Sequence, residues 1–264
     1  MNILVCNDDG FTSPGIKAAV EAVCGLGKVT VVAPSSQQTG VGRSLDSAAR
    51  QSLRPIRFLA HGRRITAYAA NAAPARLVQH ALHTIFRTTP PDLVVSGVNC
   101  GENIGSSITA SGTIGAALEA ASYDVPALAV SRGIDAARHV RFSDLDWTAC
   151  RHFTRYFAQR LLKRKMPAGV SVLNVNVPAA ASPSTPWTMT RLSRQPYYAY
   201  VLPRPSKRSK FDDARFLTEV DHRTLESDSD IHAVVRKGIV SVTPLSLDLT
   251  SRVDRTTLKA RLRR

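Results

Sequence analysis

The amino-acid sequence predicts an α/β protein built on a mainly parallel sheet with helices on both of its faces. Two observations lead to this class. Short apolar runs without alternation, typical of strands buried on both faces, recur along the first two thirds of the chain. Stretches with the helical period separate these runs, and such a regular alternation of strand and helix is typical of a doubly wound sheet.

The first strand and helix show the pattern clearly. The apolar run at residues 3–6 ends at the turn-forming residues 7–10. A helix is expected at residues 14–23, because Pro14 suits a first helical turn and apolar residues recur on one face. The full set of expected elements is strands at 3–6, 29–33, 92–96, 127–130 and 170–175, and helices at 14–23, 74–86, 113–122 and 147–165. The expected architecture is therefore Rossmann-like, in three layers, with ligands bound at the carboxyl ends of the strands.

The character of the chain changes from about residue 182. Prolines punctuate this part, aromatic residues cluster at 197–200, and the helical period is absent. We interpret residues 188–226 as a C-terminal β arm that projects from the core of a single domain spanning 1–264, with a surface loop as the alternative. Such arms are often used in oligomerisation. A last strand is expected at 238–245.

Composition restricts the classes of partner. The 35 basic and 20 acidic residues give a net charge of +15, which attracts ligands that carry phosphate. Nucleic acid is the alternative partner, but the charge is spread along the chain and no nucleic-acid-binding module is recognised. No apolar run approaches the roughly 20 residues that span a bilayer, so no membrane partner is expected.

The cysteines and the N-terminus indicate the compartment. Cys6, Cys24, Cys100 and Cys150 lie far apart without a CxxC pair, which argues against a zinc or redox motif and favours free thiols. The N-terminus has no pattern of a signal peptide. The expected location is therefore cytoplasmic.

Three polar loops follow three of the apolar runs, and each carries oxygen ligands. Adjacent Asp8 and Asp9 repel each other unless a cation offsets their charge, and hard divalent cations favour such oxygens; a solvated turn is the alternative. The loop at 35–44 offers hydroxyls and glycines. In the third loop, at 96–105, Asn99 can present a carbonyl oxygen to a metal.

The segment at 111–117 resembles a helix start that is rich in small residues. The exposed N–H groups and the dipole of such a helix make a natural seat for phosphate. Neither a GxGxxG fingerprint nor a GxxxxGK[ST] loop is present, which disfavours dinucleotides and nucleoside triphosphates.

Together these loops resemble the SurE family, the survival proteins that act as nucleoside monophosphate phosphatases. The resemblance extends over nearly the whole chain and depends on the blocks NILVCNDDGFTSPGI, VTVVAPSSQQTGVGRSL, PDLVVSGVNCGENIG, SGTIGAALEA, VPALAVS, LNVNVP and GIVSVTPLSLDLT. It implies a metal-dependent hydrolase of nucleoside 5′- and 3′-monophosphates, with polyphosphate as a further candidate substrate. It also implies a homodimer or homotetramer.

The resemblance assigns the site residues. One divalent ion, Mg²⁺ or Mn²⁺, is expected on Asp8, Asp9, Thr39 and Asn99, with Thr39 in a position where the family usually has serine. The phosphate-binding residues are then Ser111, Gly112 and Thr113.

One block departs from the family. Residues 72–77 read AAPARL where the pattern is close to GTPADC, so a threonine hydroxyl and an aspartate are lost. We expect a water molecule to attack phosphorus with Asp8 or Asp9 as the catalytic base. A non-catalytic nucleotide-binding or regulatory protein that keeps these loops is the alternative, which the altered block slightly favours.

Overall fold

The computed structural model describes residues 1–134 and 145–263. Within them, ten strands form one sheet in the order β3-β5-β2-β1-β6-β7-β8-β12-β9, with β4 paired to β5, and two more form a separate hairpin. The strands are β1 (Asn2–Cys6), β2 (Lys28–Pro34), β3 (Arg54–Pro55), β4 (Phe58–Ala60), β5 (Arg63–Ala70), β6 (Leu93–Cys100), β7 (Ala127–Arg132), β8 (Val172–Val177), β9 (Trp187–Met189), β10 (Tyr198–Val201), β11 (Arg215–Thr218) and β12 (Val240–Leu245). The helices are α1 (Pro14–Val23), α2 (Pro74–His83), α3 (Gly112–Ala121), α4 (Thr148–Lys163) and α5 (Arg255–Leu262), with short η1 (Ser106–Ala110), η4 (Phe211–Asp213) and η5 (His232–Arg236).

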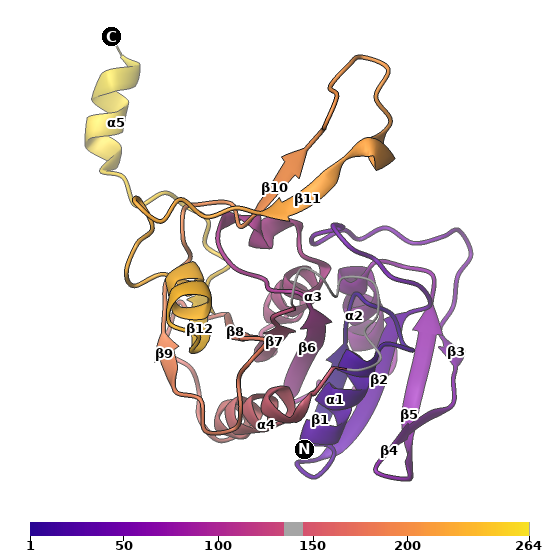
Figure 1. Ribbon diagram of the computed structural model, residues 1–264. Helices are drawn as coiled ribbons and strands as arrows, with labels where there is room; N and C mark the ends of the chain where they lie inside the picture. The colour runs from indigo at the N-terminus through magenta and orange to yellow at the C-terminus, as the bar shows by residue number, and fades with distance from the viewer. Residues whose placement is uncertain (135–144, 264) are drawn as a thin grey trace.

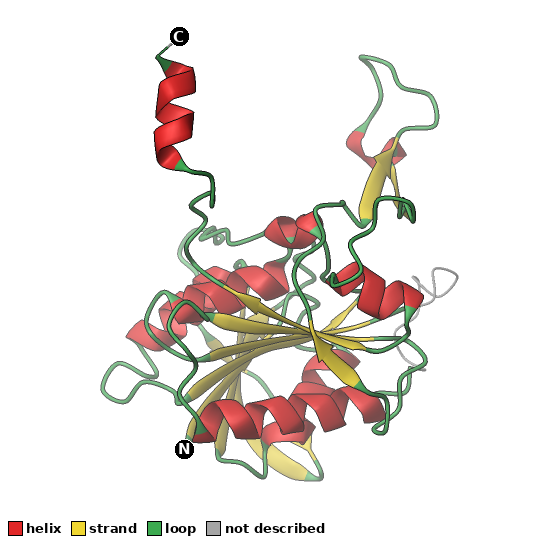
Figure 2. Cartoon of the chain, turned by 90° about the vertical axis from the view of Figure 1, so that its left-hand side faces the viewer, coloured by secondary structure: helices red, strands yellow, loops and turns green. Residues whose placement is uncertain are grey.

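The predicted fold class is confirmed. Strands β5, β2, β1, β6, β7 and β8 run parallel, and the helices lie on both sides of the sheet, as Figure 2 shows. The sequence patterns gave no strand at β3, β4 or β5, and no helix at α5. The tail helix α5 extends from the body and is exposed along its length (Figure 1).

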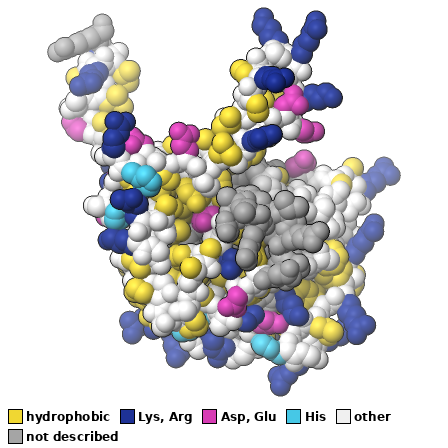
Figure 3. All heavy atoms as spheres, viewed as in Figure 1, with side chains coloured by type: hydrophobic (Ala, Val, Ile, Leu, Met, Phe, Trp, Pro, Cys, Tyr) yellow, Lys and Arg dark blue, Asp and Glu magenta, His cyan; other side chains and the backbone are white. Residues whose placement is uncertain are grey.

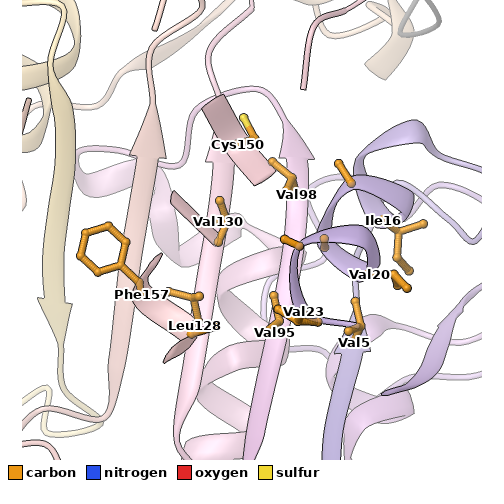
Figure 4. Close-up of a cluster of buried hydrophobic side chains, with 14 of the residues drawn as sticks. Val5, Ile16, Val20, Val23, Val95, Val98, Leu128, Val130, Cys150 and Phe157 are labelled. Carbon is orange, nitrogen blue, oxygen red and sulfur yellow. The ribbon is translucent and has the colours of Figure 1, made fainter. Parts of the chain in front are cut away.

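Two apolar layers hold the helices against the sheet. One face buries α1 and α4 around residues such as Ile16, Val95 and Phe157, and Figure 4 shows this cluster between α1 and the strands. The other face buries α2 and α3 around residues such as Leu77 and Ile114. Because both faces are covered, the central strands are apolar on both sides, which is why their runs lack alternation.

The strand order places a switch point beside β1. The chain moves from β1 outward to β2 and β5 on one side, then returns to β6 on the other side of β1 and continues to β7 and β8. The loops that follow β1 and β6 therefore leave neighbouring strands in diverging directions. Doubly wound sheets bind ligands in the crevice that such a divergence opens.

The projecting part of the C-terminal region is smaller than residues 188–226. Thr188 and Met189 belong to β9, which pairs with β12 in the main sheet. The hairpin of β10 and β11 projects from the body in Figure 1, and its loop carries the basic residues of 204–210, visible as dark blue side chains at the hairpin in Figure 3. No helix within 1–134 and 145–263 is long and apolar enough to cross a membrane.

Candidate functional site

Asp8 is buried directly after β1, against the first turn of α3. Its Oδ1 accepts a hydrogen bond from the Thr113 hydroxyl at 2.6 Å, and its Oδ2 accepts one from the Thr113 N–H at 3.1 Å. Burial raises the pKa of the Asp8 carboxyl, while the hydrogen bonds from Thr113 oppose that rise. The N-terminus of α3 thus supports a negative charge on Asp8.

Two small residues let α3 begin this close to Asp8. Ser111 is the N-cap, and its hydroxyl oxygen accepts the Ile114 N–H at 3.2 Å. A Cβ on Gly112 would lie 2.8 Å from the Asp8 Cβ and 2.9 Å from Oδ2, closer than real Cβ contacts. Glycine at 112 is therefore required for the contact between the helix and the carboxylate.

Asp9 lies beside the last residue of β6. Its Oδ2 accepts the Cys100 N–H at 3.0 Å, and its Oδ1 accepts the Gln37 amide at 3.5 Å. Burial and the charge of Asp8 raise the pKa of Asp9 to about 7. The two carboxylates therefore repel each other in the protein alone, as the sequence predicted.

Asn99 reaches the same region because β6 is irregular near its end. The register of β6 against β7 shifts between Ser96 and Asn99, and the intervening Gly97 has a φ of +126°. A Cβ on Gly97 would lie 2.2 Å from the Val130 carbonyl oxygen, so only glycine fits. The Asn99 amide nitrogen donates to the Gly101 carbonyl at 2.7 Å, which orients the amide and makes Oδ1 the atom that could contact a cation.

Thr39 lies on the exposed loop at 35–44. Its neighbour Gln38 donates its N–H to the Asp8 carbonyl oxygen at 2.7 Å, and the Gln38 carbonyl oxygen lies 3.2 Å from the Cβ position of Gly112. The backbone of this loop therefore contacts both Asp8 and α3. Within the described residues the Thr39 side chain makes no hydrogen bond.

The donor set suits one hard cation. Asp8 and Asp9 supply carboxylate oxygens, and a cation between them would offset the repulsion that raises the pKa of Asp9. Asn99 and Thr39 add neutral oxygens. Among the residues that the structure describes, no group of three or more His, Cys, Asp or Glu side chains could hold a metal. Any cation at this site would therefore depend on the neutral oxygens as well as on the two aspartates.

Several residues around the site were not predicted from the sequence. Gln37 and the Cys100 N–H hold Asp9, and both lie inside segments that had been singled out for other residues. Asn103 is the centre of a second polar cluster: its N–H donates to Asn176 Oδ1 at 2.8 Å, and its carbonyl oxygen accepts from Asn174 at 2.8 Å. The alternation of asparagines in LNVNVP was the available signal for this cluster.

The block at 72–77 forms the start of α2. Ala73 is the N-cap and provides no side-chain hydrogen bond to the helix. Arg76 is exposed and donates to Gln79 Oε1 at 2.6 Å. The departure from the family pattern therefore removes a helix cap and introduces a new side-chain contact on α2.

Comparison with known proteins gives consistent matches along the chain. Residues 3–199 match the family model described as Survival protein SurE. The protein named 5′-nucleotidase SurE from Methanosarcina mazei is 42% identical over 260 residues, covering 96% of this chain and 94% of its own. The protein of the same name from Methanocella arvoryzae is 38% identical over 257 residues, covering 94% and 93%. The crystal structure of the SurE protein from Aquifex aeolicus superposes with a TM-score of 0.77 at 29% identity, covering 99% of this chain and all of that chain.

Proposed function

This chain belongs to the SurE family, and from that premise we propose that it hydrolyses nucleoside 5′-monophosphates to nucleoside and phosphate. It is a hydrolase of phosphoric monoesters. The observation that carries the proposal is the position of Asp8 and Asp9 between the N-terminus of α3 and the end of β6, at the switch point of the sheet. Nucleoside 3′-monophosphates and polyphosphate are further proposed substrates.

Asp8, Asp9, Thr39 and Asn99 would hold one divalent ion, Mg²⁺ or Mn²⁺. When bound, such an ion supplies a positive charge that polarises the phosphoryl group and offsets the charge that develops on its oxygens. The oxygen character of all four side chains supports this assignment, because both ions prefer carboxylate and carbonyl ligands to nitrogen or sulfur.

The two aspartates differ in what they can do. Both oxygens of Asp8 accept hydrogen bonds from Thr113, which fixes that carboxylate as a ligand. Asp9 is less buried and is held more loosely, with one contact of 3.5 Å to Gln37. We therefore assign to Asp9 the removal of a proton from the attacking water, as the general base.

Residues 111–113 serve phosphate in different ways. The Ser111 oxygen accepts the Ile114 N–H, so its own O–H proton is free to donate to a phosphate oxygen. Gly112 lets the start of α3 lie close to Asp8, and we assign it to phosphate binding through its backbone rather than a side chain. Thr113 donates both its hydroxyl and its N–H to Asp8, so we assign it an indirect effect on the substrate, through that carboxylate.

The experiment is phosphate release from a panel of 5′- and 3′-monophosphates and polyphosphate, with and without Mg²⁺ or Mn²⁺. Wild type is compared with Asp9→Asn, and with Asp124→Asn as a matched control in an exposed turn whose positive φ suits asparagine. We expect metal-dependent release that is lost only in Asp9→Asn. Metal-independent release that survives this change refutes the proposal, and binding without turnover identifies a non-catalytic nucleotide-binding protein.

We also propose a homodimer or homotetramer that uses the arm at 188–226. Its hairpin exposes Tyr200, Phe216 and Leu217, and apolar side chains of this size are commonly covered at interfaces. Light scattering of the full chain and of a variant with Tyr200 and Phe216 changed to serine tests this, because the variant is expected to have a lower mass. The free thiols of the four cysteines support a cytoplasmic location.

A further inference from the structure

An ion pair joins the loop at 35–44, which carries Thr39, to helix α3 at a point away from Asp8 and Asp9. The Nε of Arg43 lies 2.7 Å from Glu119 Oε2, and the Glu119 side chain is 3% exposed while that of Arg43 is 39% exposed. A buried carboxylate is costly without a partner, so Glu119 strongly favours the position of Arg43 that is seen. The C-terminal end of the loop at 35–44 is thereby bound to the C-terminal half of α3.

The second oxygen of Glu119 is also occupied. Gln79 donates to Glu119 Oε1 at 3.1 Å and lies 3.2 Å from the Tyr123 hydroxyl. Arg76 in turn donates to Gln79 Oε1 at 2.6 Å, which orients the Gln79 amide with its nitrogen toward Glu119. With Oε1 engaged by α2, Oε2 is the oxygen left to Arg43. Arg76, one of the departures from the family pattern, belongs to this chain of contacts.

The ion pair lies near the C-terminal end of a loop whose other anchors are mostly backbone contacts. Ser35 donates its N–H to the Ala70 carbonyl at 2.9 Å, and Gln37 donates to Asp9 Oδ1 at 3.5 Å. Gln38 donates its N–H to the Asp8 carbonyl, and Gly42 donates its N–H to the Ala110 carbonyl at 2.8 Å. A Cβ on Gly115 would lie 2.2 Å from the Gly42 carbonyl oxygen, so the loop backbone packs directly on α3. Thr39 lies between these two anchors, and its exposed side chain has no hydrogen bond of its own within the described residues.

We propose that Arg43 is a positioning residue: through Glu119 it holds the loop at 35–44 so that Thr39 stays beside Asp8. This inference rests on the proposed function, because it gives Thr39 its role as a ligand. The role proposed for Arg43 is exerted through Glu119 and the loop backbone, without a contact to substrate or cation. Its effect is to reduce the conformational freedom that Thr39 would otherwise lose on binding a cation.

The experiment compares Arg43→Gln with Arg151→Gln by calorimetric titration with Mn²⁺. Arg151 is a matched control: its side chain is 38% exposed, and it pairs with the partly buried Glu21 at 3.4 Å, between α4 and α1. Arg43→Gln is expected to weaken Mn²⁺ binding about tenfold, the lower end of the effect of losing a group that supports a metal ligand. Arg151→Gln is expected to bind as wild type does.

Hydrogen exchange gives a second readout, independent of metal. The amide protons of Gln38 and Gly42 are expected to exchange faster in metal-free Arg43→Gln than in wild type, and unchanged in Arg151→Gln. Arg43→Lys, which keeps the charge opposite Glu119, is expected to restore most of the Mn²⁺ affinity. Gln79→Met removes the contact to Glu119 Oε1 and leaves the loop at 35–44 unchanged. It is expected to weaken Mn²⁺ binding by a smaller factor than Arg43→Gln does.

The outcomes separate the two proposals. Wild type that binds no Mn²⁺ overturns the proposed function and this inference with it. Wild type that binds Mn²⁺, with an affinity in Arg43→Gln within twofold of it, overturns this inference alone. Equal losses in Arg43→Gln and Arg151→Gln also overturn it, because the effect would then be a general consequence of a lost ion pair.

Discussion

Lowering the pH from 8 to 6 is expected to weaken Mn²⁺ binding by about tenfold. Asp9 must lose its proton to act as a ligand, and its pKa in the protein alone is raised to about 7 by burial and by the charge of Asp8. About nine tenths of Asp9 is then ionised at pH 8 and about one tenth at pH 6, which gives the tenfold ratio. The pKa of Asp8 is raised as well, so its titration can only steepen the fall.

Isothermal titration calorimetry with Mn²⁺ at pH 6, 7 and 8 measures this dependence. Repeating each titration in two buffers of different ionisation enthalpy counts the protons released. We expect about 0.9 proton per ion from Asp9 at pH 6 and about 0.1 at pH 8. An affinity that is constant from pH 6 to pH 8, with no proton release at pH 6, refutes the reasoning that joins Asp9 to the cation.

A second measurement isolates the cause of the raised pKa. Carboxyl carbon resonances of the metal-free protein report the titration of Asp9 directly, with a midpoint expected at about 7. In Asp8→Asn the neighbouring charge is gone, so the midpoint of Asp9 is expected at lower pH. An unchanged midpoint in that variant means that burial alone, and not the adjacent charge, sets the pKa.

Three further changes have defined outcomes. Asp9→Asn is expected to abolish phosphate release and to raise the melting temperature of the metal-free protein at pH 8 by about 5 °C. The pKa of Asp9 is raised on folding, so the folded protein loses stability as the pH rises from about 4 to 7 and this carboxyl ionises. Asparagine does not ionise, so the variant avoids that loss. Thr113→Val removes a 2.6 Å hydrogen bond to Asp8, and calorimetry is expected to show Mn²⁺ affinity reduced at least tenfold, from the loss of about 1.5–3 kcal/mol. Ala73→Ser adds the missing cap of α2, and scanning calorimetry is expected to show a melting temperature higher by about 2–4 °C.

The central part of the fold could be predicted because a strand that is buried on both faces appears in the sequence as a short apolar run without alternation. β1, β2, β6, β7 and β8 are almost entirely buried and rich in apolar residues, and each was expected within a few residues of its observed bounds. β5 was missed because its first half is exposed and carries two arginines, so the apolar run is short. The pairing of β5 with β2, β3 and β4 supplies the backbone hydrogen bonds that the sequence pattern does not reveal.

The gathering of Asp8, Asp9 and Asn99 could be predicted for the same reason. The two aspartates follow β1 and Asn99 lies at the end of β6, and these parallel strands are adjacent in the sheet, so the three residues lie at the same edge. The contacts of Gln37 and Arg43 could not be predicted, because they depend on how the loop at 35–44 folds back over α3. A polar loop with four hydroxyls and two glycines admits many such paths.

The contacts of Thr113 show what the helix-start motif at 111–117 cannot predict. A helix start rich in small residues predicts a seat for phosphate against its N–H groups; in the structure the Asp8 carboxylate accepts hydrogen bonds from the Thr113 N–H and hydroxyl. The sequence could identify the donors but not the acceptor, because the choice between a protein carboxylate and a phosphate depends on the distance from β1 to α3. Since Asp8 accepts both Thr113 donors, the proposed function leaves substrate phosphate to Ser111, Gly112 and the cation that Asp8 would hold. Under that proposal, the helix N-terminus would stabilise Asp8 as a metal ligand and would bind phosphate largely through the cation.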